Sequence, residues 1–268
     1  MAMVSAKEIQ AVCNDIIREF SPQQVILFGS YAYGTPTEAS DVDLLVVLSG
    51  VNSDGRQRAL EMKQRLPKRF RLDLHVRSSE EFAYRVSHND WFLREILEKG
   101  DVLYDTGNVK TSLRARACPS PVRLELAEGA LVPVWQESGA MNPLTLEWVE
   151  LAELDYEAAK WHVQQLPRRG VPNKVCFNAQ QCIEKYLKAW LQEANLPTPR
   201  THDLNALLAL IVPVRPEWAA WRADFSAFDN YAVDARYPGF FPTGADAAHA
   251  VRICDEVRQT VRAMLKLS

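Results

Sequence analysis

The sequence lacks an excess of charge of either sign and has few cysteines. Its 268 residues carry a formal net charge of −3, whereas a general nucleic-acid binder usually shows a basic excess; a local basic groove stays compatible with this composition. The 5 cysteines are scattered and form no CxxC pair, so neither a disulfide framework nor a zinc site is indicated, and a reducing interior fits best. They are Cys13, Cys118, Cys176, Cys182 and Cys254.

Long apolar runs are missing as well. No segment approaches the roughly 20 apolar residues of a membrane helix, and the opening "MAMVSAKEIQ" lacks the apolar core of a signal peptide. We therefore expect a cytoplasmic protein with no membrane partner. No GxxxxGK followed by Ser or Thr is present, so a P-loop is excluded. The composition, 47% hydrophobic and 24% charged, is that of a globular chain long enough for two domains.

Residues 1–105 mix strand and helix patterns. Alternating or continuous apolar runs bounded by turn residues predict strands, and apolar residues at helical spacing predict helices. The expected strands are 23–29, 41–48, 69–76 and 101–105, and the expected helices are 5–19, with Ser5 as N-cap, 54–67, 79–87 and 90–98. This order predicts one domain of mixed α and β structure.

Residues 144–268 show only helical patterns, separated by short joints that contain proline, and they predict an all-α bundle. Between the two parts, residues 106–143 are rich in glycine, proline and serine but contain "VRLEL" and "LVPVW". We interpret them as a linker that is partly packed, because these apolar patches favour burial against another surface.

The stretch "LFGSYAYGTPTEASDVDLLVVL" places Asp41 and Asp43 in an apolar strand. Side chains two residues apart on a strand share a face, and two neighbouring carboxylates repel each other unless a counter-charge is present. Magnesium would supply that charge, because it prefers carboxylate and phosphate oxygens. Asp73, in "RLDLH", would complete a two-metal site if its strand lies beside that of the pair.

Gly29 and Ser30 end the preceding strand. Glycine allows a phosphate to approach the backbone closely, and the serine hydroxyl and nearby N–H groups donate to phosphate. The residues that follow, "SYAYG", fit the start of a short helix. A second interpretation treats Asp41 as a turn or capping residue and Asp43 as an ordinary residue of an edge strand.

The segment "GSYAYGTPTEASDVDLLV", with Gly-Ser, ten residues and Asp-x-Asp, resembles the signature of minimal nucleotidyltransferases of the polymerase-beta superfamily. The resemblance implies a mixed sheet flanked by helices. It further implies that Gly29 and Ser30 bind the triphosphate of an NTP, most simply ATP. Asp41, Asp43 and Asp73 would bind two Mg²⁺ ions, which Mn²⁺ could replace, and act in catalysis. The implied reaction transfers a nucleoside monophosphate, AMP by preference, to an acceptor hydroxyl.

The segments "FNAQQCIEKYLKAWL", "TPRTHDLNALL" and "DARYPGFF" resemble HEPN domains. Gln181, Glu184, Lys185 and Lys188 share one polar stripe, which is either a solvated face or part of a ligand site. Likewise, Thr201 is expected to cap the helix that follows it, and His202 to bind a ligand, interpretations that do not exclude each other. The expected site for a nucleotide or phosphate comprises Gln181, Lys185, Lys188, Arg200, His202 and Arg236.

Many HEPN domains resemble RNases that carry Arg, four to six residues and then His, a spacing that residues 144–268 lack. The resemblance therefore favours a HEPN domain that binds nucleotide or acceptor, or that forms a homodimer. Two alternatives stay open: a toxin–antitoxin-like regulatory module with an RNA-directed HEPN half, and an aminoglycoside-type nucleotidyltransferase with Glu150, Glu153 and Asp155 facing a cationic drug. The acceptor, whether protein, RNA or small molecule, also stays open.

Overall fold

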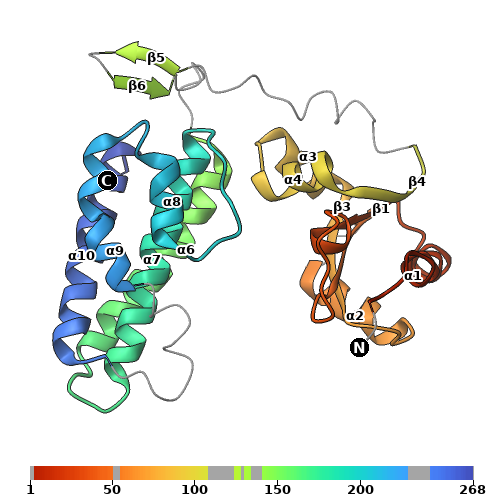
Figure 1. The fold of residues 1–268 in the computed structure, drawn as a ribbon, viewed down its shortest axis with the longest axis horizontal. Helices are drawn as coiled ribbons and strands as arrows, with labels where there is room; N and C mark the ends of the chain where they lie inside the picture. Colours follow the sequence, from red (N-terminus) through yellow and green to blue (C-terminus); the bar gives the residue numbers. More distant parts are fainter. Residues whose placement is uncertain are drawn as a thin grey trace. The chain divides into compact units, whose positions relative to one another are not determined.

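The computed structural model describes residues 3–50, 55–107, 124–127, 130–133, 141–228 and 242–267, with the backbone alone for 124–127 and 130–133. The chain divides into two compact units, Met1–Pro119 and Ser120–Ser268 (Figure 1). None of the helices in these ranges is long and apolar enough to cross a membrane.

The first unit is built on a mixed four-stranded sheet in the order β3-β2-β1-β4. The strands are β1 Gln24–Phe28, β2 Val42–Leu48, β3 Leu72–Ser78 and β4 Asp101–Asp105. β1 pairs antiparallel with β2 and with β4, whereas β2 and β3 are parallel. The parallel pair needs a crossover, and the helix α2, Gly55–Arg65, supplies it. The mixed sheet expected from the sequence is thereby confirmed.

Strict alternation along the central strands gives the sheet two separate apolar faces. Leu44 and Val46 of β2 pack with α1, Ala6–Phe20, and with α2, whereas Leu45 and Val47 pack with α3, Ser79–Ser87, and α4, Trp91–Lys99. Both faces of β2 are therefore covered, which explains its continuous apolar run. Asp43 lies on the same face as Leu45, at the end where β2 begins.

Two boundaries differ from the expected strands. β2 begins at Val42, so Asp41 precedes the strand, and β3 covers Leu72–Ser78 rather than 69–76. The parallel pairing of β2 with β3 sets where both strands begin. Val42 N–H donates to the Arg71 carbonyl at 3.0 Å, and Val42 pairs with Leu72. The start of α1 is as expected, with a capping box between Ser5 and Glu8.

The linker predicted over residues 106–143 lies mostly outside the described residues. Within it, β5, Leu124–Ala127, and β6, Ala130–Pro133, form an antiparallel hairpin. The two apolar patches of the sequence thus meet each other in a ladder. Residues 108–123, 128–129 and 134–140 are not described.

From residue 141 onward the described residues contain helices and no strand, as expected for a bundle. The helices are α6 Pro143–Val163, α7 Val171–Glu193, α8 Leu204–Ile211, the 3-10 helix η2 Pro216–Trp221, α9 Arg222–Phe228 and α10 Gly244–Met264. α6, α7 and α10 run alongside one another (Figure 1). α7 is the central helix, because its side chains are buried around nearly its whole circumference from Cys182 to Gln192.

Candidate functional site

Gly29 brings the end of β1 into contact with the carboxylate of Asp43. Phe28, the last residue of β1, pairs with Asp43 on β2, and the chain then turns through the 3-10 segment η1, Gly29–Tyr31. Gly29 has a φ of +71°, and a Cβ at this position would lie 2.2 Å from Asp43 Oδ2. Only glycine fits there, since any side chain would displace the carboxylate. The Gly29-Ser30 pair and Asp43 therefore lie together.

The third aspartate lies beside the second. Asp43 and Asp73 are directly paired in the parallel ladder of β2 and β3, so their side chains leave the same face of the sheet, about 4.8 Å apart at the backbone. The side chains of Asp41 and Asp73 are 50% and 48% exposed. This end of the sheet is consequently open to solvent, and the carboxylates avoid the full cost of burial that an apolar strand suggested.

Basic side chains lie against Asp41 and Asp73. Arg71 Nε lies 3.0 Å from Asp41 Oδ1, and Lys63 Nζ of α2 lies 3.1 Å from Asp73 Oδ1. His75 Nε2 lies 3.4 Å from the other oxygen of Asp73. Partial burial acts to raise the pKa of Asp73, but Lys63 and His75 outweigh it and lower that pKa.

These residues fit a hard divalent cation by their chemistry, since three carboxylates from two adjacent strands offer the oxygen ligands that Mg²⁺ prefers. They are not drawn into one cluster: among the described residues no group of three or more His, Cys, Asp or Glu side chains is gathered closely enough to hold a metal ion. Asp41 and Asp73 are instead each ion-paired, with Arg71 and Lys63 respectively.

We expect Gly29→Ala to lower any activity that depends on Asp43 by at least about 100-fold, because the new methyl group would displace the Asp43 carboxylate by an ångström or more. Stability should fall by about 1–3 kcal/mol. Gly34→Ala is the matched control, since Gly34 has a φ of +77° but nothing within 4 Å of the added Cβ. Steady-state rates and thermal melts of both variants test this, and equal losses of activity would contradict it.

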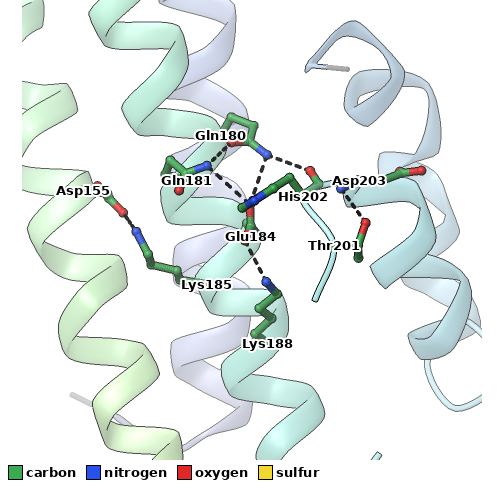
Figure 2. A network of polar contacts seen from close by, with 9 residues as sticks. All are labelled: Asp155, Gln180, Gln181, Glu184, Lys185, Lys188, Thr201, His202 and Asp203. Carbon is green, nitrogen blue, oxygen red and sulfur yellow. Dashed lines mark hydrogen bonds and ion pairs between the residues drawn. The ribbon is translucent and has the colours of Figure 1, made fainter. Parts of the chain in front are cut away.

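In the bundle, a polar network surrounds Glu184 on α7 (Figure 2). Glu184 is 3% exposed; its Oε1 lies 2.8 Å from Lys188 Nζ, and its Oε2 lies 3.0 Å from His202 Nδ1. The Gln180 side chain, which is 1% exposed, donates to the His202 carbonyl at 3.0 Å and to Glu184 at 3.4 Å. The network thus ties the segment before α8 to the central helix.

The expected HEPN ligand residues are only partly brought together. Gln181, Lys188 and His202 meet at Glu184, whereas Lys185 turns away to pair with Asp155 of α6 (Figure 2). Both lysines therefore already have an anionic partner. Arg200 is exposed in the segment before α8, and Arg236 lies outside the described residues. The interpretation of the whole stripe as a solvated face is wrong for Glu184 and Lys188, which are buried.

Two details of this region differ from expectation. The N-cap of α8 is Asp203, whose side chain accepts from Ala206 N–H, whereas Thr201 accepts from Asp203 N–H. Gln180 lies in the segment that resembles HEPN domains but was not among the expected ligand residues. The available signal was a spacing of four residues, Gln180, Glu184, Lys188 and Gln192, in a helix whose other positions are largely apolar.

Two of the three acidic residues of α6 expected to face a cationic drug, Glu153 and Asp155, instead bind basic side chains of other helices in the bundle. Arg258 of α10 binds Glu153 through two hydrogen bonds of 2.8 Å, and Arg262 and the Tyr186 hydroxyl also donate to it. Burial acts to raise the pKa of Glu153, but Arg258 and Tyr186 lower it overall. With Asp155 paired to Lys185, only Glu150 of the three is exposed. Glu153 and Asp155 thus already have basic partners within the bundle, and the drug-binding alternative stays a prediction.

Comparison with known proteins defines the class of both units. Residues 11–102 match the Nucleotidyltransferase domain family, and residues 145–264 match the HEPN domain family. The chain is similar to a protein of Methanocaldococcus jannaschii named as a candidate protein adenylyltransferase, with 34% identity over 82 residues, 31% of this chain and 78% of that protein. The chain therefore belongs to the nucleotidyltransferase family through its N-terminal domain, and it carries a C-terminal HEPN domain.

Among solved structures, a nucleotidyltransferase-like protein from Exiguobacterium sibiricum is similar over 94% of this chain and 75% of its own, with 11% identity and a TM-score of 0.42. This likeness is distant.

Proposed function

We propose that the chain is a magnesium-dependent nucleotidyltransferase that transfers AMP from ATP to an acceptor hydroxyl and releases pyrophosphate. The observation that carries this proposal is the contact between Gly29 and Asp43. It brings the proposed phosphate-binding pair, Gly29 and Ser30, next to the paired aspartates Asp43 and Asp73. Membership of the nucleotidyltransferase family supports the type of reaction. AMP is preferred because the similar archaeal protein bears the name of a protein adenylyltransferase, and that name favours a protein hydroxyl as acceptor.

Each residue has a role in this proposal. Ser30, half-buried beside Gly29, would donate its hydroxyl to the triphosphate and hold the departing pyrophosphate. Asp41, Asp43 and Asp73 would hold Mg²⁺, which supplies charge neutralisation for the phosphates and activation of the attacking oxygen. Asp73 would also help to deprotonate the acceptor hydroxyl, directly or through an ordered water.

The HEPN domain has a second part in the proposal. We assign to it the binding of nucleotide or acceptor, supported by His202, whose imidazole is 66% exposed while its Nδ1 faces the buried Glu184. His202 and Arg200 both lie in the exposed segment before α8, so this segment is our candidate for contact with an incoming phosphate. A homodimer through this domain, and an RNA-directed activity in a toxin–antitoxin-like module, stay predictions.

The test uses the purified full chain with Mg²⁺ and ATP labelled either at the α- or at the γ-phosphate, together with a lysate as a source of acceptors. We expect label from α-labelled ATP to enter a macromolecule or the chain itself, and no label from γ-labelled ATP, because pyrophosphate leaves. Label from the γ-phosphate alone would indicate a kinase. No transfer, together with no ATP binding by calorimetry, would contradict the proposal.

A further inference from the structure

Asp41 and Asp73, at the open end of the sheet, are engaged by basic side chains from this chain. Lys63 comes from α2 and Arg71 from the segment just before β3, so two separate elements supply the positive charges. Each base lies within 3.1 Å of a carboxylate oxygen, at Asp73 and Asp41 respectively. A cation held by Asp41 and Asp73 would therefore compete with these bases for carboxylate oxygens.

A simple count of charge shows the competition. Asp41 and Asp73 contribute two negative charges, and Lys63 and Arg71 already balance them. A divalent cation added on top of both bases would make the group positive. The side chains of Lys63 and Arg71 are 38% and 58% exposed, so each has room to leave its partner. Their ion pairs are of the exposed kind that contributes only about 0–1 kcal/mol, which a divalent cation outcompetes.

We propose that Lys63 and Arg71 are the counter-ions of Asp73 and Asp41 when no divalent cation is bound. Both basic side chains must move away from the aspartates before a divalent cation binds. Their ion pairs therefore raise the cation concentration at which the site is half occupied. This inference rests on the proposed function, since it requires the aspartates to be cation ligands. The two bases are positioning residues: they decide where the carboxylates point when no cation is bound.

Lys63→Gln tests the inference by a binding measurement. Titration of the full chain with Mn²⁺ by calorimetry, at fixed ionic strength and without nucleotide, should show binding about three-fold or more tighter than in the wild type. Arg71→Gln should act in the same direction. In thermal melts, Lys63→Gln should be slightly less stable in EDTA and should gain more from Mn²⁺, because the cation replaces the lost ammonium.

Lys68→Gln is the matched control, since Lys68 is an exposed lysine of the segment between α2 and β3, with no ion pair recorded in the described part of the chain. If Lys68→Gln binds Mn²⁺ as much more tightly as Lys63→Gln does, the effect comes from the change in net charge alone, and the inference is overturned. Unchanged or weaker Mn²⁺ binding in Lys63→Gln would also overturn it while leaving the proposed function intact. Failure of the wild type to bind Mn²⁺, or binding that survives Asp43→Asn, would instead contradict the carboxylate site of the proposed function.

Discussion

Asp43→Asn is expected to reduce nucleotidyl transfer at least about 1,000-fold, which corresponds to about 4 kcal/mol of lost transition-state stabilisation. Asp43 is the carboxylate that touches Gly29 and pairs with Asp73, so it belongs to both the proposed phosphate site and the proposed cation site. An amide keeps the shape of the side chain but removes its charge. Transfer of α-labelled AMP at saturating Mg²⁺, compared with the wild type, measures the loss.

The same variant should keep the stability of the domain within about 1 kcal/mol, because the substitution removes one of two like charges on directly paired residues. Asp101→Asn is the matched control, since Asp101 is an exposed aspartate of the same sheet, on the edge strand β4 that pairs with β1. It should retain full activity. An Asp43→Asn variant that stays within ten-fold of the wild-type rate would contradict the assigned role, whereas one that unfolds would indicate a structural role.

Glu184→Gln is expected to destabilise the HEPN domain by about 3–5 kcal/mol, because it leaves the charge of Lys188 buried without its partner. The side chain of Lys188 is 8% exposed, so water cannot replace the carboxylate. The contacts of Gln180 and His202 with Glu184 would also weaken. Urea unfolding followed by tryptophan fluorescence reports on this domain, since Trp148, Trp161, Trp190, Trp218 and Trp221 all lie within it.

Two further variants test whether the loss of stability in Glu184→Gln comes from the buried charge of Lys188 rather than from the removal of any glutamate. Glu157→Gln, on an exposed position of α6, should change the unfolding free energy by less than about 0.5 kcal/mol. Adding Lys188→Met to Glu184→Gln removes the stranded charge and should recover at least half of the loss. A loss of less than about 1 kcal/mol in the unfolding free energy for Glu184→Gln alone would contradict a structural role for the network. It would instead favour a role of these residues in binding a ligand.

The local part of the nucleotidyltransferase site could be predicted from the sequence because it is set by spacing along one chain segment. Gly29, Ser30, Asp41 and Asp43 lie within fifteen residues, and a strand followed by a turn and a second strand must return them to one end of the sheet. Asp73 required one more assumption, that its strand lies beside β2, and the parallel ladder confirms that. The roles of these residues stay predictions until the activity is measured.

Pairing between distant side chains could not be predicted in the same way. In the sequence, Lys63 and Arg71 were two of many basic residues, and their spacing does not show which aspartate each one meets. On α7 the sequence indicated a polar stripe but not its burial, because burial depends on the elements packed around the helix. The segment that carries His202 lies against one side of the stripe, and α6, with Asp155, lies against another.

The sequence by itself thus determined the two-part organisation, the mixed and all-α classes of the parts, and the spacing of the glycine-serine and aspartate motif, since each follows from periodicity or from residues close together in the chain. Only the tertiary structure decided which charges meet. It placed Arg71 and Lys63 on two of the aspartates and buried Glu184 between Lys188 and His202. The physical reason is that a charged side chain pairs with an oppositely charged side chain that is close to it in the folded protein. Which side chain is close depends on how the helices and strands pack, not on the order of residues in the sequence.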